Sequence, residues 1–128
     1  MIRGIRGAVT VEHNDADEII QSTKQLIEEM ASQNEIDPET IAQVLISVTT
    51  DLNATFPAKA LRLLEGWKYV PVMCMPEIEV PGSLPKCIRV MMTVNTNKAQ
   101  QEVEHVYLND AVKLRPDLVE SNHTKERR

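Results

Sequence analysis

The chain has 128 residues, of which 42% are hydrophobic, and this composition suits one domain with a modest core. A formal net charge of −5 argues against a nucleic-acid-binding protein, which usually has a basic face. No stretch approaches the roughly 20 apolar residues of a membrane-spanning helix, and the start, MIRGIRGAVT, has no apolar core of signal-peptide length. We therefore expect a cytoplasmic protein that binds neither nucleic acid nor a membrane.

The N-terminal part of the chain predicts a strand followed by an amphipathic helix. Residues 2–11, IRGIRGAVTV, alternate apolar and other side chains and are expected to form the strand. The segment that follows has apolar or small residues at intervals of three and one, which is the stripe of an amphipathic helix. Asn14 or Asp15 is expected to cap the start of this helix, and Asn34 is expected to end it.

The middle of the chain predicts short elements that are punctuated by prolines. In DPET, Pro38 is expected to begin about one turn of helix. The segment IAQVLISVTTDL is rich in β-branched residues and predicts a second strand near 43–49. FPAKALRLLEG, which ends at Gly66, predicts a short helix. WKYVPVMCM predicts a third strand, in which Pro71 indicates an edge position or a bulge.

The C-terminal part predicts a loop, a strand and a hairpin. Three prolines and a glycine make 76–86 an irregular loop, and CIRVMMTVNT at 87–96 reads as a fourth strand. HVYLNDAVKLRPDL at 105–118 is expected to be a hairpin that turns at Asn109–Asp110. The polar segment 119–128 is expected to be a mobile tail.

This order of elements predicts an α+β fold in one domain, residues 1–118. Strands and helices in the order β-α-β-α-β-β indicate a mixed β-sheet with helices on one face. Such a sheet leaves its other face uncovered, and in a chain of this size self-association is the simplest way to cover it.

The cysteines and histidines do not suggest a metal site. Cys74 and Cys87 form no CxxC pair, and none of the three histidines stands at ligand spacing from either of them. The sequence also lacks a glycine-rich phosphate loop of the GxGxxG type. We therefore expect two reduced cysteines, no metal and no cofactor.

The predicted strand at 87–96 carries a charge that its neighbours do not explain. Alternation along the strand places four apolar residues on one face, which must be core: Ile88, Val90, Met92 and Val94. Arg89 lies on the opposite face beside Met91, and Arg6 stands among small residues of the first strand in the same way. Both arginines suit either an interface salt bridge or a site for a compact anion, because a guanidinium grips a carboxylate with two hydrogen bonds.

Other polar residues could belong to the same anion site. Lys59 and Arg62 are three residues apart on the predicted short helix and lie on one side of it, either as partners of surface ion pairs or as part of the site. Glu77 could be a solvated loop acid and Tyr107 a packing residue, but both could also converge on the anion. Composition and spacing leave the anion unidentified.

Four segments together resemble a known enzyme family. IRGIRGAVTV, FPAKALR, YVPVMCMPEIEVPGSLPKCIRVMMTV and HVYLNDAVKLRPDL are similar, in order from residue 2 to about 118, to the monofunctional bacterial chorismate mutases of the AroH class. The resemblance implies a homotrimer that forms a pseudo-α/β barrel, with three active sites between neighbouring subunits. It also implies an isomerase of phenylalanine and tyrosine biosynthesis that converts chorismate to prephenate by an intramolecular Claisen rearrangement, without a cofactor.

The resemblance implies that Arg89, Glu77 and Arg6 are the catalytic residues. Arg89 matches an arginine at the ether oxygen of the substrate, where negative charge grows in the transition state. Arg6 and Tyr107 match the pair that holds the carboxylate of the enolpyruvyl side chain. Glu77 and Cys74 match the groups that meet the ring hydroxyl.

The resemblance also implies which residues form the walls and the mouth of the site. The walls are matched by Phe56, Ala58, Val72, Met73 and Leu114. The mouth is matched by three cations, Lys59, Arg62 and Arg115. Met73 and Val9 stand where the family pattern has threonine, and we expect both differences to alter affinity rather than abolish activity.

Three other interpretations stay open. They are an imine deaminase of the Rid type, a regulatory trimer that binds a carboxylate without chemistry, and a structural trimer held by salt bridges between subunits. Glu77 argues against pure anion binding, because a site that only holds an anion gains nothing from a carboxylate across the cleft. If the chain is a chorismate mutase, we expect the charge of Arg89 to be paired by the ligand.

Overall fold

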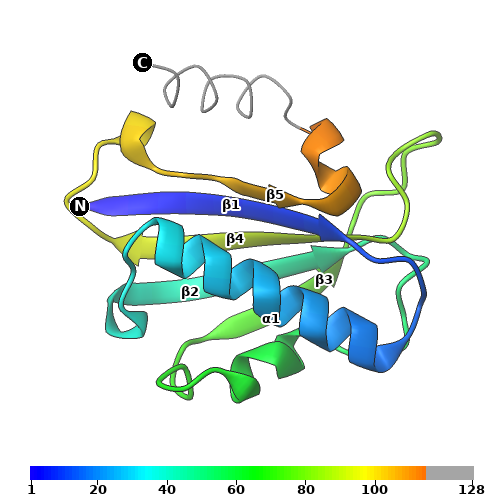
Figure 1. Cartoon of the computed structure of the whole chain (residues 1–128), viewed down its shortest axis with the longest axis horizontal. Helices are drawn as coiled ribbons and strands as arrows, with labels where there is room; N and C mark the ends of the chain where they lie inside the picture. Colours follow the sequence, from blue (N-terminus) through cyan, green and yellow to red (C-terminus); the bar gives the residue numbers. More distant parts are fainter. Residues whose placement is uncertain (115–128) are drawn as a thin grey trace.

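The structure, a computed structural model, describes residues 1–114. The α-helix and the strands of this part run in the order β1 (Ile2–Thr10), α1 (Ala16–Gln33), β2 (Ile41–Val48), β3 (Val72–Pro76), β4 (Cys87–Asn95) and β5 (Val106–Leu108) (Figure 1). Short 3-10 helices accompany them: η1 (Pro38–Thr40), η2 (Pro57–Leu63), η3 (Gln100–Glu102) and η4 (Asn109–Leu114). Arg115 and the predicted tail at 119–128 lie outside the described residues.

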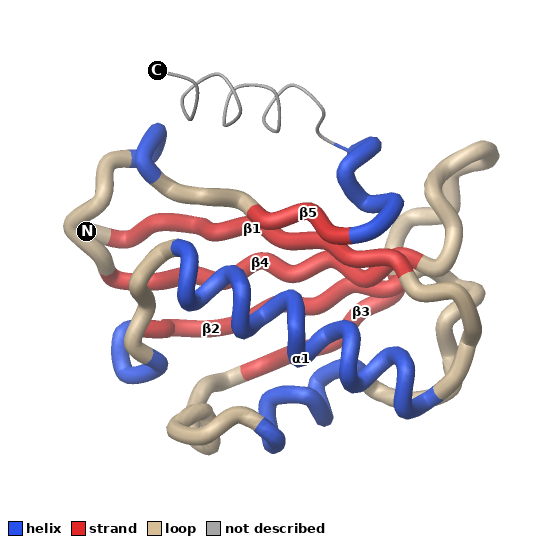
Figure 2. Tube along the Cα trace, in the orientation of Figure 1, coloured by secondary structure: helices blue, strands red, loops and turns tan. Residues whose placement is uncertain are grey.

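The strands form one mixed sheet with the order β3-β2-β4-β1-β5. The central strand β4 is antiparallel to β1 and β2, whereas β3 runs parallel to β2 and β5 runs parallel to β1. Helix α1 crosses one face of the sheet, and η2 lies beside it near β3 (Figure 2). The predicted α+β fold, a mixed sheet with helices on one face, is therefore confirmed.

Both ends of α1 are fixed by the residues that the sequence indicates. The carboxylate of Asp15 accepts a hydrogen bond from the backbone N–H of Glu18 at 3.0 Å, which satisfies one of the free donors of the first turn. At the other end the Asn34 amide donates to the carbonyls of Met30 and Glu104, each at 2.8 Å. Asn34 thus ends the helix and also ties it to the segment before β5.

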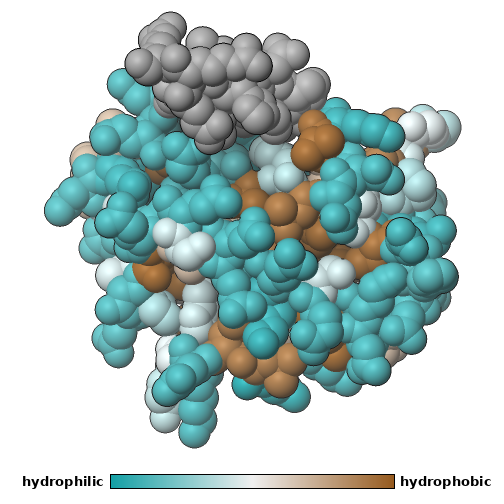
Figure 3. Space-filling model, viewed as in Figure 1, coloured by the Kyte–Doolittle hydropathy of each residue, from teal (hydrophilic) through white to brown (hydrophobic). Residues whose placement is uncertain are grey.

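The core lies between α1 and the sheet. Its fully buried members on the sheet include the four residues predicted from alternation, Ile88, Val90, Met92 and Val94. Gly7 allows the close approach of the two layers, because a Cβ at this position would collide with Met30 Sδ and lie 3.1 Å from Leu26 Cδ1. On the face of the molecule that carries α1, hydrophilic side chains predominate at the surface (Figure 3).

The opposite face of the sheet is covered in residues 1–114 only at one end, where Ala111 of η4 packs against Ala8 and Cys87. The rest of this face carries large apolar side chains. Ile2 and Met73 are 61% and 65% exposed, and Met75 and Met91 are each more than a third exposed. An open sheet face of this kind is typical of a surface that meets another protein.

The predicted hairpin at 105–118 is wrong. Val106–Leu108 pairs with Gly7–Val9 in parallel, and the chain continues into η4 instead of returning as a strand. Asn109 explains the difference, because it adopts a left-handed backbone with a φ of 56° and donates its side-chain amide to the carbonyl of Thr10 at 2.9 Å. The side chain thereby fastens the chain to the end of β1.

The third strand is shorter than predicted. Trp67 and Val70 are bonded into successive turns, with Trp67 N–H donating to the Leu64 carbonyl and Val70 N–H donating to the Trp67 carbonyl. The strand begins after Pro71, whose carbonyl accepts from Val44 N–H at 2.9 Å. The prediction of an edge position from Pro71 is confirmed, because β3 is the outermost strand on its side of the sheet.

No helix in residues 1–114 is long and apolar enough to span a bilayer. The expected cytoplasmic location stays a prediction.

Candidate active site

Most of the site residues predicted from the sequence fall into two pockets on opposite sides of the sheet. The first, which we call the sheet pocket, has a volume of about 320 Å³ and opens on the uncovered face. It is lined by Arg6, Ala8, Leu45, Ser47, Met75, Glu77, Arg89, Met91, Tyr107 and Leu114, among others. The three residues predicted to be catalytic, Arg6, Glu77 and Arg89, therefore lie in one pocket of one chain.

Arg89 has a partner within the protein. Its Nε lies 3.3 Å from Glu77 Oε2, and its side chain is 50% exposed. This partner was not predicted, because alternation along β4 reveals the face of Arg89 but not the acid that reaches it from the end of β3. Pairing of the same charge by the ligand stays a prediction. A pair made through Nε uses one of the five N–H donors of the guanidinium, so donors remain for a further acceptor.

Glu77 is held against the sheet by β2. Its backbone N–H donates to the Val48 carbonyl at 2.8 Å, and its Oε2 accepts a hydrogen bond from Ser47 Oγ at 2.9 Å. Ser47 stands directly opposite Arg89 in the pairing of β2 with β4. These contacts place the carboxylate and the guanidinium side by side in the pocket.

Arg6 and Tyr107 line the same pocket from β1 and β5. The backbone N–H of Arg6 donates to His105 Nδ1 at 2.9 Å, just before the parallel pairing of β1 with β5 begins. The hydroxyl of Tyr107 is buried and has no hydrogen-bond partner among the described residues. Leaving a buried hydroxyl unpaired costs about 1–3 kcal/mol, so this group is suited to a polar partner from outside the described chain.

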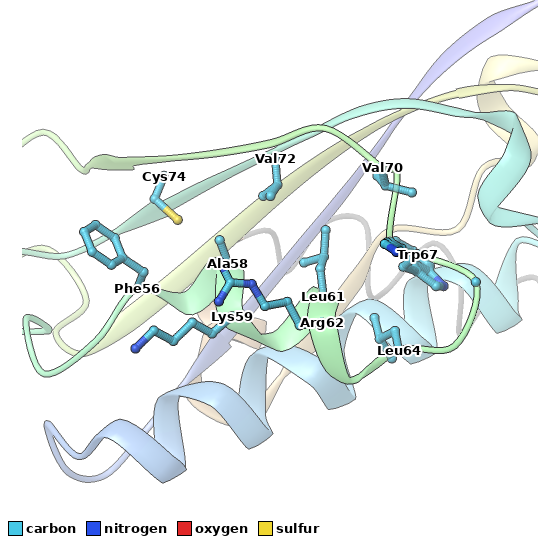
Figure 4. A pocket seen from close by; sticks show the side chains of 12 residues that line it. Phe56, Ala58, Lys59, Leu61, Arg62, Leu64, Trp67, Val70, Val72 and Cys74 are labelled. Carbon is cyan, nitrogen blue, oxygen red and sulfur yellow. The ribbon is translucent and has the colours of Figure 1, made fainter.

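The second pocket, which we call the η2 pocket, lies between η2 and β3 and has a volume of about 780 Å³. Its lining includes six residues predicted for the site: Phe56, Ala58, Lys59, Arg62, Val72 and Cys74. Cys74 and Val72 of β3 face Ala58 of η2, and the cationic side chains of Lys59 and Arg62 extend from η2 beside them (Figure 4). Two cations over an apolar wall make the electrostatic environment of this pocket favourable for an anion.

The two cysteines differ in their surroundings. Burial raises the pKa of the Cys74 thiol above its ordinary value of 9.0, an effect that the nearby backbone of Ala58 partly offsets. Burial also raises the pKa of Cys87, and there the neighbouring Arg89 is the main opposing influence. Both thiols are therefore neutral near pH 7, where Cys74 can serve as a weak hydrogen-bond donor in the η2 pocket.

One chain does not bring the two groups of residues together. Val72 and Cys74 point to the side of the sheet that carries the helices, whereas Arg89 and Glu77 are reached from the open face. Met73 lies on the open side and lines neither pocket. Leu114 lines the sheet pocket, and Arg115 lies outside the described residues.

Sequence reasoning missed part of the lining of the sheet pocket. Ser47, Leu45 and Met75 were not predicted for the site. A signal was present, because alternation along VLISV puts Leu45 and Ser47 on the face opposite Val44 and Ile46. What the sequence did not reveal is that β2 lies next to β4, which sets Ser47 against Arg89.

Comparison with known proteins identifies the family. The model of the family "Chorismate mutase type I" matches residues 2–118. Chorismate mutase AroH of Bacillus subtilis (strain 168) is 56% identical over 125 residues, which is 98% of each chain, and chorismate mutase AroH of Thermus thermophilus is 48% identical over 119 residues, covering 92% of this chain and 97% of that one. The solved structure of a chorismate mutase from Clostridium thermocellum has a TM-score of 0.82 and 53% identity, covering 84% of this chain and 96% of that chain. The chain therefore belongs to the type I chorismate mutase family.

Proposed function

We propose that this chain catalyses the rearrangement of chorismate to prephenate, a step in phenylalanine and tyrosine biosynthesis, as a homotrimer with active sites between subunits. Family membership supports the reaction. The observation that carries the site is the meeting of Arg6, Glu77, Arg89 and the unpartnered hydroxyl of Tyr107 in one pocket. These groups match the needs of a compact dianion that develops charge at one oxygen.

The separation of the two pockets supports the proposed assembly. Each active site is formed by the sheet pocket of one subunit and the η2 pocket of its neighbour, and the three sheets together make a pseudo-α/β barrel. The exposed apolar side chains on the open face of the sheet support this arrangement, because association would bury them. Closing the cleft in this way brings Lys59, Arg62 and Cys74 of one chain to Arg89 and Glu77 of another.

Arg89 supplies the main electrostatic contribution to catalysis. In the Claisen rearrangement an ether C–O bond breaks while a C–C bond forms, and negative charge grows on the ether oxygen. A guanidinium fixed beside this oxygen stabilises the transition state more than the ground state. Glu77 orients Arg89 through the contact at 3.3 Å and also faces the ring, where positive charge develops.

The remaining residues hold the substrate in its reactive shape. Arg6 and Tyr107 bind the side-chain carboxylate, which gives the buried hydroxyl its missing partner. The apolar wall of the η2 pocket confines the ring, and Lys59 and Arg62 attract the dianion to the mouth. Bringing the two reacting carbon atoms together in a chair-like conformation is a proximity effect.

The other interpretations have less support. A trimer that only binds a carboxylate does not account for Glu77, whose carboxylate lies in the pocket beside Arg89 and would repel a bound anion. An imine deaminase of the Rid type is at odds with membership of the chorismate mutase family. A purely structural role for the arginines leaves the Tyr107 hydroxyl without a partner.

A direct assay tests the proposed function. Purified protein is mixed with chorismate, and the ultraviolet absorbance of the substrate is followed, with acid conversion of prephenate to phenylpyruvate as a second readout. We expect chorismate to disappear far faster than in buffer and prephenate to appear in equal amount. Loss of chorismate at only the uncatalysed rate would refute the proposal.

A further inference from the structure

Ser47 makes a contact that none of the roles assigned above requires. Its Oγ donates to Glu77 Oε2 at 2.9 Å, and the same oxygen lies 3.3 Å from Arg89 Nε. Ser47 and Arg89 are also direct partners across the pairing of β2 with β4. One carboxylate oxygen therefore joins a rigid strand residue to the cation of the pocket.

Without Ser47 the carboxylate would be held less firmly. Glu77 follows the end of β3, and its backbone N–H is bonded to the Val48 carbonyl, but this bond does not hold the side chain. The other carboxylate oxygen, Oε1, accepts a longer bond of 3.3 Å from the backbone N–H of the adjacent Ile78, so Ser47 is the side chain that ties the carboxylate to β2. Arg89 is half exposed, and a long side chain at the surface keeps much of its rotamer freedom unless several contacts restrict it. Ser47 has a short side chain on a paired strand, so its hydroxyl is a fixed donor.

We propose that Ser47 is a positioning residue: it fixes the carboxylate of Glu77, and through it the orientation of the Arg89 guanidinium. The effect on rate rests on the proposed mutase function of the sheet pocket, whereas the effect on the orientation of Arg89 does not. Because an error of about 1 Å in a catalytic donor is enough to reduce the rate substantially, the hydroxyl contributes to turnover without touching the substrate.

Three variants test this inference kinetically. Ser47→Ala removes the donor, Ser47→Thr keeps a hydroxyl at the same place on the strand, and Thr50→Ala is the matched control. Thr50 Oγ1 donates to the carboxylate of Glu79 at 2.6 Å, so the control removes the same kind of bond from the neighbouring loop. We expect Ser47→Ala to lower kcat about tenfold with a smaller change in KM, because a hydrogen bond to a charged group is lost. Ser47→Thr should restore most of the rate, and Thr50→Ala should leave it unchanged.

A second readout does not depend on activity. The Nε–Hε resonance of Arg89, assigned by its absence from the Arg89→Lys variant, reports how firmly Nε is held against Glu77. We expect hydrogen exchange at this site to be faster in Ser47→Ala than in the wild type, and unchanged in Thr50→Ala. Thermal unfolding of the same samples tests whether all variants are folded.

The two readouts separate this inference from the proposed function. Faster exchange in Ser47→Ala together with no mutase activity in the wild type would support the positioning role and refute the function. An active wild type whose Ser47→Ala variant keeps both its kcat and its Arg89 exchange rate would overturn the positioning role. So would a loss of rate that Ser47→Thr does not restore while Arg89 exchange stays unchanged.

Discussion

At the scale of single residues, the geometry of the sheet pocket depends on Glu77 Oε2, which contacts both Ser47 and Arg89. Arg89 reaches Glu77 through Nε, the nitrogen nearest its own chain, and so presents the far side of a planar fork to the pocket. Lysine has a similar charge but no fork, and its ammonium group would be drawn to the Glu77 carboxylate as a single point. The shape of the cation therefore matters as much as its charge.

We predict that Arg89→Lys loses nearly as much activity as Arg89→Ala. The expected loss in kcat/KM is about 3 kcal/mol, or roughly 100-fold, the usual effect of removing one donor that stabilises a developing oxyanion. Steady-state kinetics with chorismate measures it, and unfolding curves show whether both variants are folded. A lysine variant with near-normal turnover would show that the fork is not needed.

Removal of the Tyr107 hydroxyl is expected to stabilise the empty protein but to weaken substrate binding. Tyr107→Phe removes a buried hydroxyl that has no partner among the described residues, so the empty protein should gain about 1 kcal/mol of unfolding free energy. The same change should raise KM about tenfold, because the substrate carboxylate loses a donor. Denaturant unfolding and kinetics on one preparation measure both effects. A variant that is less stable than the wild type would show that the hydroxyl has a partner in the assembled protein.

At the scale of elements, the position of the site residues on β1 depends on how closely α1 packs on the sheet. Gly7 belongs to β1, one residue after Arg6, and its missing side chain lets Met30 and Leu26 of α1 approach the strand. The distance between α1 and the sheet therefore influences the position of Arg6. A residue that only packs can in this way influence a residue that binds.

We predict that Gly7→Ala lowers the unfolding free energy by about 1–3 kcal/mol, because the added methyl group would overpack this part of the core. Gly4→Ala is the matched control on the same strand. Its Cβ would face the end of a flexible side chain, Met91 Sδ at 3.3 Å, on the open side of the sheet. Denaturant unfolding of both variants gives the comparison, and equal losses would contradict the importance of the contact with α1.

How far the elements could be predicted depended on whether local chemistry determines them. The cap at Asp15, the end at Asn34 and the buried face of β4 follow from short-range rules and are confirmed. The pairing of β5 could not be predicted from such rules, because Val106–Leu108 is too short to indicate its partner strand. The left-handed backbone of Asn109 then directs the chain into η4. For the same reason Ser47 was not predicted for the site, because its position beside Arg89 depends on the order of the strands in the sheet.

At the scale of the whole molecule, the residues predicted for the site lie in two separate pockets of one chain. The family resemblance predicted most of its residues, though not Ser47, Leu45 or Met75, and left open which subunit supplies each of them. In the structure Arg6, Glu77, Arg89 and Tyr107 share the sheet pocket, and the η2 pocket lies across the sheet from them. The proposed trimer with shared clefts would bring the two pockets together.

We predict that two inactive variants restore activity when they assemble together. Arg89→Ala disables the sheet pocket, and Ala58→Glu places a repelling carboxylate in the η2 pocket. Each mixed trimer should have one cleft of its three that combines two intact halves, so the purified mixed species should regain about one third of the wild-type activity per trimer. Co-expression with two purification tags and an assay of the mixed species measures this. Inactive mixed trimers would show that one subunit supplies both halves.

The contact between Glu77 and Arg89 also bears on competition from small ions. Phosphate and sulfate carry the charge of a substrate without its shape, and they would compete for a guanidinium that lacked a counter-ion. Arg89 already has one before any ligand arrives, so an inorganic ion would have to share the guanidinium with a neighbouring negative group. A larger ligand offsets that repulsion with contacts elsewhere in the cleft. The acid beside Arg89 thereby makes this position selective for size as well as charge.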